Sequence, residues 1–385
     1  MIDEKAKLCC GCKLCCNLCP TQAIDIRNHN VLNYRPHVDY DKCIKCGKCI
    51  NNCPFISFSS KSNNLSIAYA AQSKKIDDFA GSSSGGIASS LMLYALKNNY
   101  LVYSTFFHNG QFCVRHIDDL KCLRMASGSK YVYSNPALVY KEIADKLPSN
   151  RVLFIGTPCQ VYALKSFIPL KHQNMLTTVD LVCHGTPTQE FLNSYLTSKK
   201  IFIEEVKNIS FRKGSLFEIE IFREKENLLF KESARFNSYY TLFLSGSSFQ
   251  DGCYSCPFAS SKRYSDLTLG DYWGAPETIK TKFRYKNRVS LVLVSTENGK
   301  HFLSEVESEL TLIETNYDYA ISCNPQLQYP SKLTRDRASI ENSYNKFKNE
   351  NFDFLIKKTS VPKLIKKRKI KSFIKRLFCR ENCEV

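Results

Sequence analysis

The sequence predicts a mixed fold class, α+β or α/β, in which a small cysteine-rich module precedes a larger domain built on a mixed sheet. Two observations carry this prediction. Regularly spaced cysteines crowd the first 54 residues, and short β-branched runs then alternate with helical spacing between residues 66 and 330. With 385 residues, of which 43% are hydrophobic and 23% charged, the chain can bury a core in two or three domains.

The cysteine-rich module, assigned to residues 1–60, contains the pattern C-x2-C-x2-C-x3-C-P twice, with every position offset by 34 residues. Bacterial ferredoxins that hold two 4Fe-4S clusters have this spacing. Zinc or disulfides are the alternative, but zinc sites use paired C-x2-C units with a longer gap between them. The pattern predicts a bacterial-type ferredoxin domain whose ligands are Cys9, Cys12, Cys15, Cys19, Cys43, Cys46, Cys49 and Cys53.

The two clusters are expected to exchange one ligand. In this spacing the fourth cysteine of each run ligates the cluster of the other run. Cys53 therefore joins the first three cysteines of the first run, and Cys19 joins those of the second. Two further cysteines interrupt the spacing and are interpreted as packing thiols, namely Cys10 and Cys16.

The larger domain, assigned to residues 66–330, follows a Ser/Asn-rich stretch at 57–64 that is expected to be a linker. Helical spacing predicts helices at 85–99 and 137–147, the first after a Gly/Ser loop. Alternation across 207–232 predicts antiparallel strands. Short apolar runs predict buried strands at 101–107, 151–156, 177–183 and 290–296, the last followed by a helix.

The formal net charge is +18 at pH 7, and its distribution disfavours a nucleic-acid-binding face on the body of the protein. Residues 357–380 contain eleven Lys or Arg and no Asp or Glu, so most of the excess lies in one segment. We assign residues 331–385 to a basic helical tail. A non-enzymatic iron–sulfur protein that binds nucleic acid through this tail is an alternative from a different functional class.

The tail has an apolar stripe at helical spacing, formed by Ile370, Phe373, Ile374, Leu377 and Phe378. A basic amphipathic helix can lie on an anionic membrane surface. Docking on the protein's own body and a solvated tail are the alternatives. The N-terminus has no apolar signal region, and no stretch approaches the roughly 18 apolar residues that span a bilayer. Since the clusters need reduced thiolates, we expect a cytoplasmic protein, with the tail touching the inner face of the membrane.

Four further cysteines have unusual settings. Cys159 and Cys183 each follow a predicted buried strand, and such strand ends project into the crevice of an α/β sheet where ligands bind. Cys253 and Cys256 form a C-x2-C that supplies two more thiols. Together they predict a third iron–sulfur site, and buried structural thiols are the alternative.

Six motifs occur in a fixed order and cover about residues 68–280. They are GSSSGGI at 81–87, SGSKY at 127–131, GTPCQ at 156–160, DLVCHG at 180–185, the C-x2-C at 253–256 and SDLTLGDYWG at 265–274. This set resembles the beta subunit family of coenzyme F-420 hydrogenases and dehydrogenases. An N-terminal ferredoxin half is common in the bacterial members of that family, including those of the polysaccharide-biosynthesis type.

The resemblance implies an FAD enzyme with a 4Fe-4S cluster beside the flavin, so that residues 66–330 become an FAD and iron–sulfur catalytic domain. It also implies that the four later cysteines are cluster ligands, since they match the family's cluster cysteines. The residues that match its flavin-contacting regions are Ser82, Ser83, Ser84, Gly85, Gly86, Ser129, Lys130 and Tyr131. Asp271, in the SDLTLGDYWG motif, is a further candidate for cofactor binding.

The chemistry of these residues agrees with a flavin. A Gly/Ser loop before a helix offers backbone N–H groups and a dipole to a phosphate, although a flexible turn has the same composition. Lys130 is expected to neutralise a diphosphate or the flavin N1 region, with a surface lysine as the alternative. Asp271 stands where the backbone can approach a planar cofactor, or at a plain strand-to-turn junction. His184 is the candidate proton donor, with backbone hydrogen bonding as the alternative.

These expectations define an iron–sulfur flavoprotein oxidoreductase. Electrons from reduced ferredoxin or another donor are expected to pass through the ferredoxin-type clusters and a third 4Fe-4S cluster to FAD and an organic substrate. By analogy with bacterial relatives, that substrate is a small molecule or lipid-linked sugar of exopolysaccharide or capsule biosynthesis. The alternative is an electron-transfer beta subunit that reduces or oxidises coenzyme F-420 beside a hydrogenase or formate dehydrogenase partner.

Overall fold

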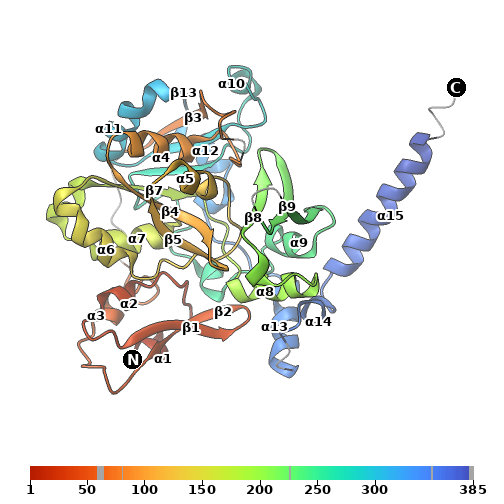
Figure 1. Ribbon diagram of the computed structural model, residues 1–385, viewed down its shortest axis with the longest axis horizontal. Helices are drawn as coiled ribbons and strands as arrows, with labels where there is room; N and C mark the ends of the chain where they lie inside the picture. Colours follow the sequence, from red (N-terminus) through yellow and green to blue (C-terminus); the bar gives the residue numbers. More distant parts are fainter. Residues whose placement is uncertain (59–64, 80, 225–226, 348–349, 381–385) are drawn as a thin grey trace.

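The computed structural model describes the chain except for residues 59–64, 80, 225–226, 348–349 and 381–385. Three parts surround the candidate site: an N-terminal module, an eight-stranded sheet with helices on both faces, and a smaller three-stranded sheet with its own helices (Figure 1). A long C-terminal helix leaves the third part and projects from the body. The mixed sheet flanked by helices confirms the predicted fold class.

The N-terminal module is a short antiparallel hairpin with three one-turn helices. Its strands pair with Ile24 opposite Val38, and their apolar side chains pack on buried Ile2 and Cys16. This core is small, and cysteines of both loops pack against it. The elements are α1 (Ile2–Lys5), α2 (Leu14–Leu18), β1 (Ile24–Asn30), β2 (Asn33–Val38) and α3 (Lys48–Asn51).

The large sheet has the strand order β13-β3-β12-β11-β7-β6-β4-β5. Its centre, from β11 to β4, is parallel, and the strands on both sides of that centre are antiparallel. Strand β6 is buried along its whole length, as its continuous apolar run predicts for a strand covered on both faces. The strands are β3 (Ile67–Ser73), β4 (Leu101–His108), β5 (Gln111–Ile117), β6 (Val152–Gly156), β7 (Leu176–Leu181), β11 (Leu267–Asp271), β12 (Ser290–Val294) and β13 (Leu310–Thr315).

Helices cover both faces of this sheet. Leu91 of α4 and Phe302 of α11 belong to one buried cluster, and Tyr140 of α6 and Val161 of α7 belong to another. The predicted helix and strand segments of this domain are all present, although strand β7 ends two residues before Cys183. The helices are α4 (Ile87–Lys97), α5 (Leu120–Ala126), α6 (Val139–Lys146), α7 (Pro158–Phe167), α10 (Glu277–Lys280), α11 (Glu297–Val306) and α12 (Tyr317–Ser322).

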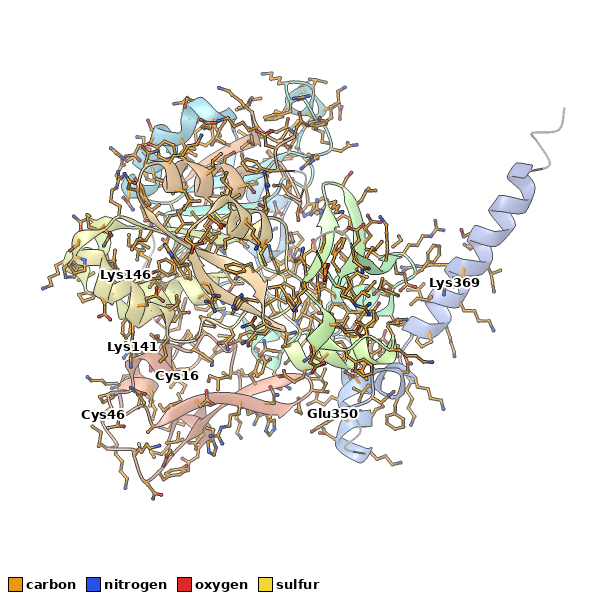
Figure 2. All side chains as sticks on the ribbon, viewed as in Figure 1. Cys16, Cys46, Lys141, Lys146, Glu350 and Lys369 are labelled. Atoms are coloured by element: carbon orange, nitrogen blue, oxygen red, sulfur yellow. The ribbon has the colours of Figure 1, made fainter. Side chains whose placement is uncertain are left out.

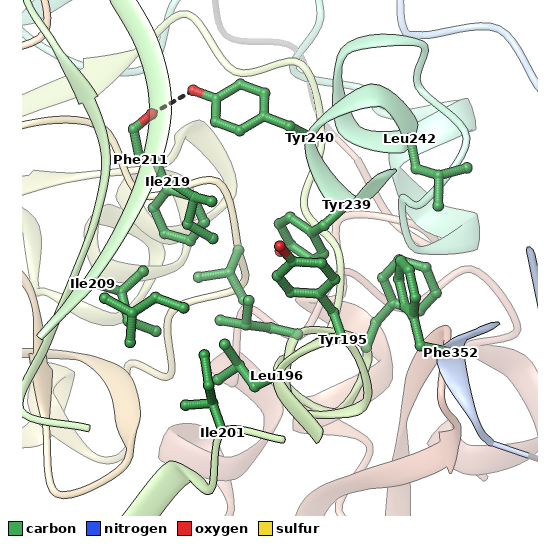
Figure 3. Packing of buried hydrophobic residues seen from close by; sticks show 14 of the residues in the cluster. Tyr195, Leu196, Ile201, Ile209, Phe211, Ile219, Tyr239, Tyr240, Leu242 and Phe352 are labelled. Atoms are coloured by element: carbon green, nitrogen blue, oxygen red, sulfur yellow. Dashed lines mark hydrogen bonds between the residues drawn. The ribbon is translucent and has the colours of Figure 1, made fainter. Parts of the chain in front are cut away.

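The small sheet has the order β10-β9-β8 and packs on helices from distant parts of the chain. Figure 3 shows aromatic rings at the centre of this packing, where the Tyr240 hydroxyl donates to the carbonyl of Phe211 at 2.6 Å. Tyr195, Tyr239 and Phe352 complete the ring cluster. The elements are β8 (Asn208–Lys213), β9 (Leu216–Phe222), β10 (Leu228–Ser233), α8 (Gln189–Ser198), α9 (Ser238–Leu244), α13 (Arg335–Phe347) and α14 (Phe352–Ile356).

The C-terminal segment differs from the expected tail. Helices α13 and α14 pack into the body, because Ile340 and Phe352 are fully buried and the Arg337 side chain is enclosed. Only α15 (Val361–Arg380) projects, and its first turns are anchored by buried Val361 and by Arg368, which donates to the carbonyl of Arg235. In the apolar stripe, Ile370 is 50% exposed, and the four side chains from 373 onward lie outside the described residues.

Candidate functional site

Two cavities in the N-terminal module collect the eight predicted ligand cysteines in two sets. Cys53 lines the first cavity with the three leading cysteines of the first run, and Cys19 lines the second with those of the second run. The structure therefore brings together the cysteines in the crossed arrangement that their spacing predicts. The sets are Cys9, Cys12, Cys15 and Cys53, and Cys19, Cys43, Cys46 and Cys49.

The two cysteine loops repeat in conformation as well as in sequence. Gly11 and Lys13 have positive φ in the first loop, and so do Lys45 and Gly47, which lie 34 residues later. Left-handed residues between the cysteines curl the backbone around the cavity. The curl turns backbone N–H groups inward, as at Gly11, whose N–H lies 3.3 Å from the sulfur of Cys9. Such N–H groups stabilise thiolate ligands.

A third group of cysteines forms around one cavity in the larger domain. It is made of Cys159 at the start of α7, Cys183 just after β7, and Cys253 and Cys256 at the 3-10 turn Asp251–Ser255. The seventeen described cysteines are all free thiols, so no disulfide joins this group. Burial raises the pKa of Cys253 to about 12 and that of Cys256 to about 11. Soft thiol donors in this number suit an iron–sulfur cluster, whose binding would displace their protons.

Buried polar contacts hold this third group in place. Arg337 is fully buried, donating to Oδ1 of Asp251 at 2.7 Å and to the carbonyl of Phe249 at 3.1 Å, and thereby fixes the turn that carries Cys253. On the other side, the hydroxyl of Thr157 lies 3.2 Å from the sulfur of Cys159. Arg337 was not predicted, because it comes from a helix that the sequence assigned to the tail.

A further cavity adjoins the cavity of the third cysteine group and is lined by the predicted flavin segments. Cys183, His184 and Gly185 line both cavities, as do Ser134 and Thr157 from two other segments, so the cysteine group and this space share a wall. The predicted residues on its wall are Ser82, Ser83, Ser84, Gly86, Ser129, Lys130, Tyr131, His184 and Asp271.

Gly85 does not line this cavity. Its N–H donates to the hydroxyl of Ser290 at 2.9 Å, and a Cβ at this position would lie 2.6 Å from the carbonyl oxygen of Ala71. Gly85 is therefore needed for close packing of the loop on β3 and β12. Gly86 has φ +79° and begins α4, whose first turn faces the cavity and offers backbone N–H groups to an anion.

Lys130 differs from the expectation in its partners. Its ammonium donates to the carbonyls of Ala126, Ser127 and Gly128 and so closes the C-terminal end of α5. All three of its donors are therefore used within the protein, which leaves none for a diphosphate. Burial lowers the pKa of Lys130 to about 7 from its ordinary value near 10.5. Proximity to the cavity combined with this pKa makes Lys130 a group that can gain or lose a proton near neutral pH.

Asp271 forms a bidentate ion pair with Arg212, at 2.6 Å and 3.1 Å, on the cavity wall. The guanidinium of Arg212 also lies 4.4 Å from the centre of the Phe217 ring. Arg212 was missed in the sequence because β8 carries no motif. Asp266, from the same motif as Asp271, is buried and accepts from Thr178, so it serves the packing of β11 on β7.

His184 lines both cavities, and its side chain is exposed there. Burial lowers the pKa of His184 below its ordinary value, and the charge of Asp271 opposes that shift only in part. The imidazole is therefore neutral at pH 7, with one N–H to donate and one nitrogen to accept. Its backbone carbonyl accepts from the hydroxyl of Ser331 at 2.6 Å, which fixes the loop without using the ring.

Comparison with known proteins identifies the larger domain. Residues 149–318, which include all four cysteines of the third group, match the family described as the C terminus of the coenzyme F420 hydrogenase/dehydrogenase beta subunit. This segment is a domain of that beta-subunit family. Residues 35–58 match a 4Fe-4S binding domain, and they contain the second cysteine run. The chain is thus an iron–sulfur electron-transfer protein related to the F420 hydrogenase beta subunit.

Among solved structures, the protein is similar to a chain of the xenon-derivatised F420-reducing [NiFe] hydrogenase complex from Methanosarcina barkeri. The identity is 17% and the TM-score 0.46, over 74% of this chain and 94% of that chain. No curated protein matches the chain significantly. Within the part of the chain that the structure describes, no helix has the length and apolarity required to cross a bilayer.

Proposed function

We propose that the chain is an iron–sulfur flavoprotein oxidoreductase with three 4Fe-4S sites and one FAD site. The observation that carries this proposal is the loop Cys183–Gly185, which lines both the cavity of the third cysteine group and the cavity of the predicted flavin segments. A cluster and a flavin held on the two sides of one loop would be near enough to exchange electrons.

The N-terminal module would receive electrons from outside. Cys46 is the exposed member of its eight ligand cysteines, and Figure 2 places it at the outer edge of the module. The set that begins at Cys9 lies against the larger domain, because Cys12 also lines the cavity of the third cysteine group. This order favours reduced ferredoxin or another one-electron donor docking near Cys46.

The flavin cavity has walls that suit FAD. The first turn of α4 offers N–H groups to a diphosphate, and Tyr131 stacks on Phe243 with their ring centres 4.4 Å apart, which makes a flat apolar wall. FAD, when bound, supplies the conversion between one-electron and two-electron chemistry. Neutral His184 and Lys130, with its pKa near 7, are the groups of this chain that can hold a proton at the cavity.

The electron acceptor is proposed to be an organic substrate, a small molecule or lipid-linked sugar of exopolysaccharide or capsule biosynthesis. Support comes from the resemblance to bacterial relatives and from α15, whose projecting basic helix would suit a protein that works at the inner membrane surface. The alternative acceptor is coenzyme F420, which the family match favours.

Reoxidation of the reduced protein by each candidate acceptor distinguishes the two proposals. The protein would be reduced anoxically, and its reoxidation by coenzyme F420 and by sugar nucleotides would be followed through the absorbance of the flavin. Fast reoxidation by a sugar nucleotide, with none by coenzyme F420, supports the first acceptor, and the reverse result supports the second. Denaturing the anoxically purified protein should release FAD, and a protein without flavin would contradict the proposal.

A further inference from the structure

The Gly/Ser loop at 82–86 is held in shape from outside the flavin cavity. The guanidinium of Arg288, which is not among the described residues that line this cavity, donates to the carbonyl of Ser82 at 3.1 Å and to that of Ser84 at 3.2 Å. The N–H of Gly214, in the turn between β8 and β9, donates to the carbonyl of Ser82 at 2.9 Å. Two carbonyls of the loop are therefore fixed on the side away from the cavity.

These contacts turn N–H groups of the loop towards the cavity. A trans peptide holds its C=O and its N–H on opposite sides, so the N–H of Ser83 points away from the guanidinium that binds the carbonyl of Ser82. The carbonyl of Gly85 accepts from the N–H of Ser73 at 2.7 Å, which likewise turns the N–H of Gly86 away from β3. Neither of the two N–H groups has an acceptor among the described residues, and both residues line the cavity.

The two cations on the cavity wall already have partners. Lys130 donates to three carbonyls, and Arg212 forms its bidentate pair with Asp271. An anionic group in this cavity would therefore be bound by the N–H groups of the loop and of the first turn of α4. A hydroxyl on the same wall independently indicates a polar ligand. Ser104 is only 7% exposed, and its hydroxyl has no hydrogen-bond partner within the described part of the chain.

On the basis of the proposed function, we propose that Arg288 is a positioning residue for the diphosphate of FAD. It keeps the carbonyls of Ser82 and Ser84 away from the cavity, so that the loop presents N–H groups and no carbonyl oxygens there to the phosphate oxygens. Hydrogen bonds from N–H groups to an anion are stronger than those between neutral groups. Arg288 acts through the loop and does not touch the ligand. The sequence could not reveal this role, because 204 residues separate Arg288 from Ser84.

Arg284 is a matched control from the same segment. Its guanidinium lies 5.3 Å from the ring centre of Tyr285, and that of Arg288 lies 5.8 Å from the same ring. Arg284, however, is exposed and pairs with the carboxylate of Asp77 at 2.6 Å. The two arginines thus share a segment and an aromatic neighbour, and they differ in the contact with the Gly/Ser loop.

The test measures FAD release from the anoxically purified full-length protein. Dilution gives the dissociation constant through the fluorescence of free FAD, and iron content reports that each variant is folded. In Arg288→Met the dissociation constant should rise about tenfold, which corresponds to the loss of one hydrogen bond to a charged group. Arg288→Lys keeps a cationic donor and should recover part of the affinity, and Arg284→Met should leave the dissociation constant unchanged.

Inorganic pyrophosphate provides a second measurement. It should compete with the diphosphate of FAD for the same N–H groups, and so increase FAD release from the wild type beyond the effect of chloride at equal ionic strength. In Arg288→Met this competition should be weaker, because the loop no longer holds its N–H groups towards the cavity.

Three results would overturn the role of Arg288. These are an unchanged dissociation constant in Arg288→Met, an equal rise in Arg284→Met, and a wild-type protein from which pyrophosphate releases no more FAD than chloride does. The last result needs no variant, so it decides the matter even where Arg288→Met does not fold. Failure of the underlying function looks different. A wild-type protein that contains no flavin and binds none when FAD is added would refute the flavin site itself.

Discussion

Gly252 packs against the backbone of Cys9, so that a Cβ at Gly252 would lie 3.0 Å from the Cys9 carbonyl oxygen. This contact joins the turn that carries Cys253 to the first ligand of the N-terminal module. The two proposed electron-transfer units are therefore docked on one another through backbone atoms. A larger residue in place of Gly252 would meet backbone, and movement of a side chain could not relieve that clash.

Substitution of Gly252 should loosen this docking. In Gly252→Ala the new methyl group meets backbone on the Cys9 side, and overpacking of this kind costs about 1–3 kcal/mol. Chemical denaturation under anoxic conditions should show that loss. Gly81→Ala is the matched control, since a Cβ there meets its nearest atom at 4.0 Å, and its effect should stay within about 0.5 kcal/mol. Equal effects of the two substitutions would contradict the docking contact.

Arg337 is predicted to be essential for the third cysteine group. Arg337→Met removes a fully buried cation from Asp251, whose side chain is 26% exposed, and from Glu341, which should cost about 1–3 kcal/mol and release the iron of the third site. Arg284→Met removes an exposed pair with Asp77 of similar length and should cost less than about 1 kcal/mol. Thermal unfolding and iron content measure both. Normal iron content in Arg337→Met would show that the turn holds its shape unaided.

Lys130 predicts a pH dependence of stability. Because its pKa of about 7 in the folded protein lies below the unfolded value near 10.5, the unfolded chain binds more protons between these values. Stability should therefore rise with pH from about 7 towards 10, by up to about 1.4 kcal/mol per pH unit from this group. The three carbonyls that accept from Lys130 favour the ammonium and limit the effect.

Comparison of variants isolates the contribution of Lys130 to the pH dependence of stability. Lys130→Met should remove it, so the difference in unfolding free energy between variant and wild type should change with pH over this window. Lys121→Met, at an exposed position on helix α5, should follow the wild-type pH dependence. Parallel pH profiles for Lys130→Met and the wild type would mean that Lys130 stays charged in the folded protein.

Helix α15 is predicted to contact anionic membranes. A chain that ends after Arg368 keeps the anchors Val361 and Ile365, which pack on the body, and should fold normally. It loses the projecting basic turns and should bind vesicles containing anionic lipid much more weakly than the full chain does in a sedimentation assay. Vesicles of neutral lipid are the control. Equal binding of the two chains to anionic vesicles would refute the membrane contact.

The sequence predicted those parts of the protein in which chemistry depends on local spacing. The crossed cysteine sets follow from the two runs alone, and the parallel strands that end near Cys159 and Cys183 follow from their apolar runs. Local spacing also explains the repeated left-handed residues, since Gly11 and Lys45 occupy the same place in the two loops.

Residues that act through distant partners could not be predicted in this way. Arg212 meets Asp271 across 59 residues and Arg337 meets Asp251 across 86, and neither arginine lies in a motif. The packing of helix α13 into the body could not be predicted either. Its polar sequence resembles that of a solvated helix, although the fold buries Arg337 and Ile340. Lys130 is a different case, because its partners are the nearby carbonyls of Ala126, Ser127 and Gly128, two of which lie in its own motif.

The central claim is a third cluster site beside a flavin cavity, and iron and flavin content measure it most directly. The anoxically purified wild type should contain about twelve irons and one FAD per chain, and Cys183→Ser should contain about eight irons. The eight irons that remain would belong to the N-terminal module, whose ligands Cys183 does not touch. A wild-type content near eight irons, unchanged in Cys183→Ser, would contradict the account.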